Sequence, residues 1–140
     1  MAEIGFEGLT ELMLDLEDVA NIPQDVQDEM LSAQADVVAV AQKEKARAYG
    51  VADTGLLIAS IKKGRPKTKK GVRVIYVTAS GSRRRGKTTV RNAEIAFLNE
   101  YGTKHQRARP FIRDANEASA EAATAAAMQV YDKYLKSKNL

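Results

Sequence analysis

The sequence predicts an α+β fold in a single domain that spans residues 1–140. Two segments, near residues 23–49 and 110–136, have the apolar spacing or alanine content of long helices, and residues 72–78 have the composition of a central strand. With 140 residues, 44% hydrophobic and 29% charged, the chain has the length and composition of one globular domain. We therefore expect a small antiparallel sheet packed with a long helix from the N-terminal half and an alanine-rich C-terminal helix.

The first 22 residues are predicted to form an acidic helix at the periphery of the domain. Apolar side chains recur there at the three- and four-residue steps of an amphipathic helix, at Leu9, Leu12, Met13, Leu16 and Val19. The Asn21-Ile22-Pro23 segment interrupts this pattern.

The long helix near residues 23–49 has both a start signal and a stop signal. Pro23 suits the first position of a helix, and Gly50 can end one. Between them runs one apolar stripe, formed by Val26, Met30, Ala33, Val37 and Val40.

Residues 53–79 are predicted to form a short helix followed by a pair of strands. Asp53 or Thr54 can cap a helix that carries the apolar residues 56–61. Residues 72–78 are apolar on both faces apart from Arg73, which is typical of a covered central strand. Residues 60–63 are candidates for its antiparallel partner, and residues 64–71, which contain Pro66, form a turn or hairpin loop.

Residues 80–92 are predicted to form a mobile basic loop, since their like charges repel and no packing pattern is visible. Gly81 to Thr88 match the spacing of a phosphate-binding loop, but Thr88-Thr89-Val90 is a poor helix start, so we expect no nucleotide site. Thr88 to Val90, after the loop's basic residues, can form a further strand. The basic side chains are instead candidates for contact with DNA or a protein partner: Arg83, Arg84, Arg85 and Lys87.

The last third of the chain is predicted to contain two helices joined by a loop. Residues 93–101 favour a short helix and residues 102–109 a loop, after which Pro110 opens the last helix. Acidic residues near its start and lysines near its end agree with the helix dipole. Its many alanines leave a smooth surface, which either lies flat on the sheet or contacts another subunit.

The charge is distributed unevenly along the chain. Residues 1–36 contain ten acids and no base, whereas residues 43–113 contain nineteen Lys or Arg against four acids. The resulting acidic and basic surfaces either stack on other subunits or are merely solvated faces.

Composition argues against most enzyme classes. The chain has no cysteine and a single histidine, His105, so thiolate chemistry and multi-histidine metal sites are not expected. No paired carboxylates and no Ser-His constellation can be recognised. We expect no catalytic residue, no cofactor and no metal. No apolar run reaches the roughly 20 residues of a membrane helix, so we expect no membrane partner.

Two segments resemble the signatures of a phage protein family. Residues 53–61 resemble the pattern Thr-Gly-x-Leu-x-x-Ser-Ile. Residues 100–103 and 108–115 together resemble Glu-Tyr/Phe-Gly-Thr followed by Ala-Arg-Pro-Phe-Ile/Leu-Arg-Pro-Ala, except that Asp114 replaces the second proline. In this order and spacing, across residues 24–135, they resemble the family named after gene product ten of the Hong Kong ninety-seven phage.

The resemblance implies a tail-completion, head–tail joining or minor tail protein in the neck of a long-tailed bacteriophage or prophage. Such a protein is a structural part of the virion, present in the host cytoplasm before assembly. It forms a homo-oligomeric ring, hexameric to match the tail, and contacts a head-closure or connector ring and the tail tube or terminator. The alternatives are a tail-terminator ring subunit and a small basic protein that binds DNA non-specifically.

The motif positions of that family either fix the fold or form a subunit interface. Arg109 and Arg113 are expected to pair with Glu100, with Asp53 or with a neighbouring subunit. The full set is Thr54, Gly55, Leu57, Ser60, Ile61, Glu100, Tyr101, Gly102, Thr103, Arg109, Pro110, Phe111, Ile112 and Arg113.

Overall fold

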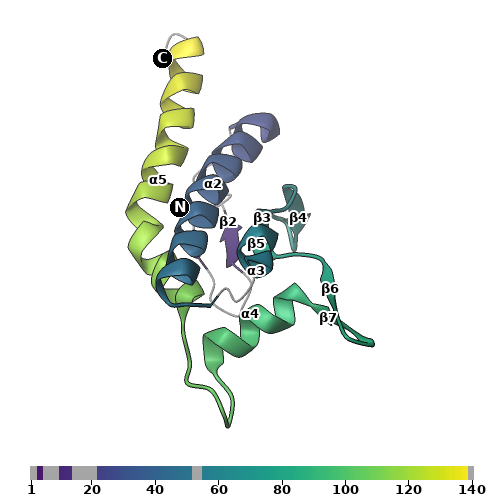
Figure 1. The fold of residues 1–140 in the computed structure, drawn as a ribbon. Coiled ribbons are helices and arrows are strands. Elements are labelled where there is room, and N and C mark those ends of the chain that lie inside the picture. Colours follow the sequence, from purple (N-terminus) through teal and green to yellow (C-terminus); the bar gives the residue numbers. More distant parts are fainter. Residues whose placement is uncertain (1–2, 5–9, 14–21, 52–54, 139–140) are drawn as a thin grey trace.

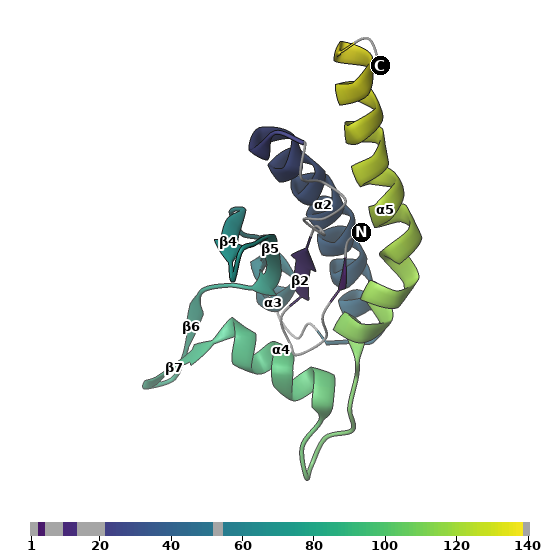
Figure 2. The ribbon, with the colours of Figure 1, turned by 180° about the vertical axis from the view of Figure 1, so that it is seen from behind.

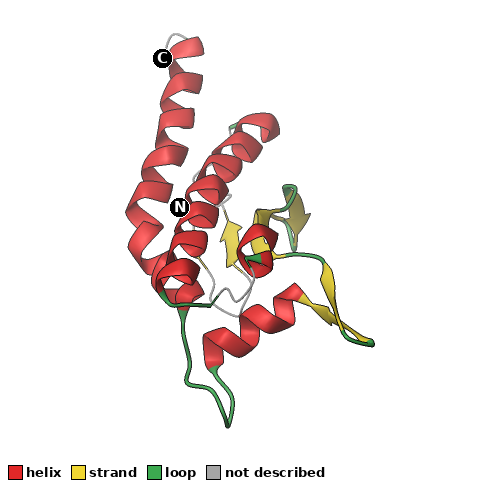
Figure 3. Cartoon of the chain, viewed as in Figure 1, coloured by secondary structure: helices red, strands yellow, loops and turns green. Residues whose placement is uncertain are grey.

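A long helix lies against a small antiparallel sheet, and a second long helix packs along the first (Figure 1). The computed structural model describes residues 3–4, 10–13, 22–51 and 55–138. The predicted α+β class is confirmed, as the mixture of helices and strands in Figure 3 shows. In chain order the elements are β1 (Glu3–Ile4), β2 (Thr10–Met13), α2 (Gln24–Ala48), α3 (Leu56–Ser60), β3 (Ile61–Lys63), β4 (Lys67–Lys69), β5 (Val72–Ala79), β6 (Ser82–Arg85), β7 (Thr88–Arg91), α4 (Asn92–Tyr101) and α5 (Phe111–Ser137).

The two long helices run antiparallel to each other. The Tyr49 hydroxyl, just after α2, donates a hydrogen bond to Asp114 in the first turn of α5. At the opposite end, Val26 of α2 and Tyr134 of α5 line one pocket. Both helices begin after the prolines that the sequence indicated, Pro23 and Pro110. The predicted bounds of both helices are therefore confirmed to within a residue or two.

The sheet is built around β5. Its strand order is β1-β2-β5-β3, and β4 also pairs with β5, all in antiparallel register. Lys63 lies opposite Val77 and Lys67 opposite Val74, so one extra residue between β3 and β4 forms a bulge. The predicted central strand and its partner are confirmed. The 64–71 segment contains the additional strand β4 and the turn that joins it to β5 in a hairpin.

The predicted N-terminal helix is wrong where the structure describes it, because residues 10–13 form strand β2. Thr10 and Leu12 are both fully buried, whereas Glu11 is half-buried and lies 3.5 Å from the Lys69 ammonium group. This alternation matches the two-residue period of a strand with one covered face. Residues 3–4, also within the predicted helix, form strand β1, and residues 1–2, 5–9 and 14–21 lie outside the described residues.

A buried polar cluster ties β2 to both long helices. The Gln42 amide donates to Thr10 Oγ1 at 2.6 Å and to Asn116 Oδ1 at 3.1 Å, and the Asn116 amide donates to Thr10 Oγ1 at 3.1 Å. All three side chains are at most 1% exposed. Because a buried amide without a partner is strongly destabilising, this cluster fixes the register of three elements.

The predicted mobile basic loop is instead a β-hairpin. Strands β6 and β7 pair from Ser82 opposite Arg91 to Arg85 opposite Thr88, around a two-residue turn that begins at Gly86. Successive side chains of a strand point to opposite faces, which separates the neighbouring arginines and lowers their repulsion. The hairpin is a separate sheet that projects away from the helix pair in both views (Figures 1 and 2).

Candidate subunit interface

The buried carboxylate of Glu100, near the end of α4, caps the start of α5. It accepts hydrogen bonds from the backbone N–H of Ile112 at 2.8 Å and of Arg113 at 3.1 Å. These are two of the N–H groups that have no partner within a helix. Burial raises the pKa of the Glu100 carboxyl above its ordinary value, while the two hydrogen bonds act in the opposite direction. Glu100 therefore connects the end of α4 to the start of α5.

The turn after α4 requires glycine at position 102. Gly102 has a φ of +79°, and a Cβ added there would lie 2.8 Å from the backbone nitrogen of Ala108 and 2.9 Å from the carbonyl oxygen of Gln106. Thr103 holds the same turn, since its Oγ1 accepts the backbone N–H of His105 at 3.2 Å. Thr103 therefore satisfies a backbone donor within this turn.

The start of α5 is anchored by Phe111 and Ile112, which are 0% and 3% exposed. Of the partners expected for Arg109, Glu100 is not the one found, because the Arg109 guanidinium donates to the carbonyl oxygen of Gly50 at 2.7 Å. Glu100 is instead occupied by backbone donors, so the carboxylate serves the helix end and not an arginine side chain. The Arg113 guanidinium is half-exposed and lies 3.2 Å from Asp114.

The first motif segment is also largely structural. Gly55, with a φ of +77°, starts α3, and Leu57 and Ile61 are each 1% exposed. The Ser60 hydroxyl donates to the Leu57 carbonyl at 2.6 Å, and the Ser60 carbonyl accepts the backbone N–H of Ser80 at 2.8 Å. Thr54 and Asp53 lie outside the described residues. Helices α3 and α4 contact each other, so the two motif segments are neighbours in space.

The outward face of α4 is apolar. Phe97, Leu98 and Tyr101 are 50%, 47% and 50% exposed, and the Phe97 and Tyr101 rings lie 4.7 Å apart between centroids. We call these three residues the α4 ridge. A surface helix ordinarily turns its polar face outward, so this arrangement is the reverse of the usual one. Sequence reasoning identified Tyr101 through the motif but missed Phe97 and Leu98, whose spacing also suits a helix that packs into a core.

The α4 ridge continues into the basic hairpin, because β7 leads directly into α4. Arg84 and Lys87 are exposed on the hairpin. Arg83 lines a pocket of about 140 Å³ together with Arg109, Asn99 and Gln106, which joins the hairpin to the second motif segment. The Arg85 side chain lies outside the described part of the chain. Gly81 to Thr88 contain strand β6, the turn and the start of β7 and do not open a helix, so they lack the geometry of a phosphate loop.

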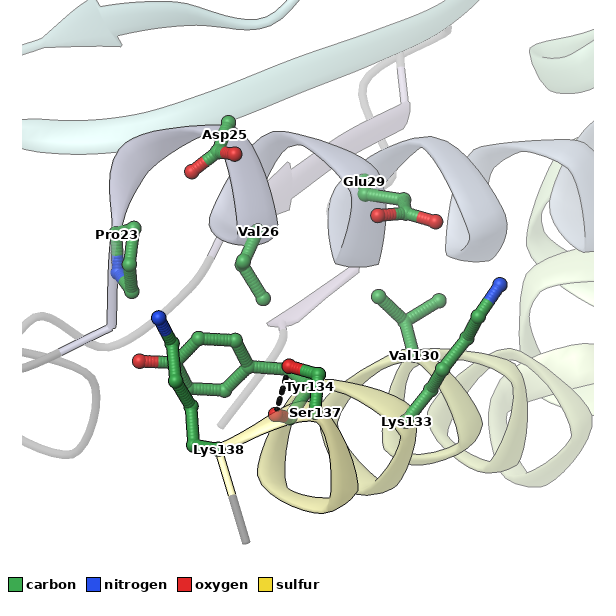
Figure 4. A pocket seen from close by; sticks show the side chains of 9 residues that line it. All are labelled: Pro23, Asp25, Val26, Glu29, Val130, Lys133, Tyr134, Ser137 and Lys138. Carbon is green, nitrogen blue, oxygen red and sulfur yellow. Dashed lines mark hydrogen bonds between the residues drawn. The ribbon is translucent and has the colours of Figure 1, made fainter.

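A larger pocket, of about 350 Å³, opens between the start of α2 and the end of α5 (Figure 4). Val26, Val130 and Tyr134 line it together with charged side chains of both signs, and it contains none of the predicted site residues. The Ser137 hydroxyl donates to the Tyr134 carbonyl within its own helix turn. Among the described residues, no group of three His, Cys, Asp or Glu side chains is placed to hold a metal ion.

None of the helices in the described part of the chain combines the length and the apolar character needed to cross a membrane. Comparison with protein-family models, with curated proteins and with solved structures gave no match.

Proposed function

We propose that this chain is a structural subunit of the neck of a long-tailed bacteriophage or prophage, a tail-completion or head–tail joining component that acts by ring assembly and not by catalysis. The observation that carries the proposal is the α4 ridge, of which Tyr101 belongs to the second of the two family-like segments and Phe97 and Leu98 lie just before it. Three large apolar side chains on the outward face of one helix are typical of a protein–protein contact surface.

The division of the motif residues supports this assignment. Glu100, Gly102, Phe111 and Ile112 form the turn and the helix cap that hold α4 in place. Tyr101 belongs to the same segment, yet half of its surface faces outward. A segment that both fixes a helix and presents its outer face is suited to build a subunit interface. The proposed partners are further copies of the chain, a head-closure or connector ring, and the tail tube or terminator.

Deletion of the gene from the phage or prophage that encodes it tests the proposal. We expect lysates of the deletion strain to contain filled heads and complete tails that are not joined, as counted by negative-stain electron microscopy. Purified wild-type protein added to the lysate should restore joined, infectious particles. Infectious particles with stable head–tail joints in the deletion strain would refute the proposal.

A non-specific DNA-binding function is the second candidate, and the projecting β6–β7 hairpin favours it. Its exposed cations Arg84, Lys87 and Arg91 suit phosphate contact. Binding of the isolated chain to random-sequence duplex DNA, with an affinity that falls steeply with salt, would support this function. Arg84→Gln/Lys87→Gln should then reduce the salt dependence.

A further inference from the structure

Leu98 of the α4 ridge and Arg83 of the β6–β7 hairpin line one pocket, so the ridge and the hairpin adjoin and together present apolar and basic side chains. Residues 80–113 contain nine Lys or Arg and two acids, and one of these acids, Glu100, is buried. The exposed acid in this surface is Glu94. A partner for this surface therefore needs an acidic face on which aromatic side chains can lie.

The outer face of α5 has these properties. From Asp114 to Asp132 the helix contains four acids and no base. Glu117 and Glu121 are exposed on it, and so is Met128, at 45%. The alanines between them give a smooth surface that aromatic rings can approach closely, and a thioether contacts such rings favourably. We call the exposed side of α5 between residues 117 and 132 the α5 outer face.

We propose that the α4 ridge and the basic hairpin of one copy dock on the α5 outer face of a second copy. This inference rests on the proposed function, because it names the contact from which the ring is built. The two surfaces belong to different elements: α5 stands beside α2, while α4 and the hairpin lie at the other end of the fold (Figures 1 and 2). A contact between two different surfaces can repeat head-to-tail from copy to copy, and such a contact generates a ring when its rotation closes.

The first experiment measures self-association of the full chain by sedimentation velocity and native mass spectrometry. We expect the wild type to form a closed oligomer, and Phe97→Ser/Tyr101→Ser to raise the dissociation constant at least about tenfold. Val40→Ser is the matched control, since Val40 is 56% exposed and belongs to α2, which is part of neither surface. Circular dichroism establishes that each variant is folded.

The second experiment exchanges the charges. The hairpin variant Arg84→Glu/Lys87→Glu and the α5 variant Glu117→Lys/Glu121→Lys should each fail to self-associate, because like charges then face each other. Mixed in equal amounts, they should associate, since each basic surface again meets an acidic one. Association of the mixture, with both single variants monomeric, identifies the two surfaces as partners.

Two results would overturn the docking site: a wild type that stays monomeric at every soluble concentration, and ridge and charge variants that associate as tightly as the wild type. The second result leaves ring assembly intact and removes only the assigned contact. Self-association that depends on these surfaces, in a protein whose deletion leaves head–tail joints intact, would instead keep the contact and remove the neck function.

Discussion

Replacing Glu100 with alanine removes the shared acceptor of two backbone N–H groups at the start of α5. The side chain is 4% exposed, and the N–H groups of Ile112 and Arg113 lie 2.8 and 3.1 Å from its two oxygens. Loss of a helix N-terminal cap destabilises a protein by about 1 kcal/mol, and a buried donor left without a partner by about 1–3 kcal/mol. We therefore expect Glu100→Ala to lower the free energy of unfolding by about 2–4 kcal/mol.

Urea denaturation followed by circular dichroism measures this change, since the chain has no tryptophan for fluorescence. Glu94→Ala is the matched control because Glu94 is an exposed glutamate on the same helix, and we expect it to change stability by about 0.5 kcal/mol or less. Glu100→Gln keeps one acceptor oxygen but sets its NH2 group against the second N–H donor, so we expect it to lower the free energy of unfolding by about 1–3 kcal/mol, less than Glu100→Ala does. If Glu100→Ala were no more destabilising than Glu94→Ala, the capping role would be refuted.

The raised pKa of Glu100 adds a test by pH. Because burial raises its pKa in the folded protein, the folded state binds the proton more tightly than the unfolded state. Stability relative to Glu100→Gln should therefore fall as pH rises from the ordinary carboxyl range through the raised pKa. A difference between the two proteins that is flat, or that rises with pH in this window, would contradict the assigned cause of the shift.

Two further substitutions test the turn and the buried cluster. Gly102→Ala should lower the free energy of unfolding by about 2–4 kcal/mol in urea denaturation, because its Cβ meets backbone atoms at a positive φ. Gly55→Ala has a similar φ but no atom within 4 Å of the added Cβ, and it should lower the free energy of unfolding by about 1 kcal/mol. Equal effects of the two substitutions would contradict the close contact as the cause. Asn116→Ala should lower the free energy of unfolding by about 2–3 kcal/mol, because the Gln42 amide and the Thr10 hydroxyl lose a buried partner. It should also speed amide hydrogen exchange in β2. Unchanged exchange in β2 would show that the cluster does not hold the strand.

The helices and the central strand could be predicted because their signals are local. Pro23 and Gly50 bracket α2, and Pro110 precedes α5. The apolar run of β5 is long enough to indicate a strand that is covered on both faces, and not a turn. In each case the intrinsic propensity, the apolar periodicity and the end signals indicate the same element, and the tertiary contacts favour that element too.

Strand β2 was not predictable because its sequence fits two periods. Leu9, Leu12 and Met13 match a helix, whereas Thr10 and Leu12 match a short strand. The choice depends on contacts between Thr10 and Asn116, which are 106 residues apart. The β6–β7 hairpin was missed for another reason. Its strands pair through their backbones, and a run of arginines lacks the alternation of apolar and polar side chains from which a strand is predicted.

The candidate interface was predicted only in part. The motif pointed to Glu100 and Tyr101, but the sequence does not show that one is buried as a helix cap while the other faces outward. That division depends on which face of α4 meets the core, and Ile95 and Ala96, 8% and 1% exposed, occupy that face. Phe97 and Leu98 are left outside as a consequence. The ridge is thus a property of packing and not of composition.

The position of the protein in the virion tests the central claim most directly. An epitope tag placed after the end of α5, detected with gold-labelled antibody on purified particles, reports that position by electron microscopy. A neck subunit predicts gold at the junction between head and tail, on wild-type particles that remain infectious. Gold at the tail tip or along the DNA of opened heads, or particles without label, would contradict the assignment.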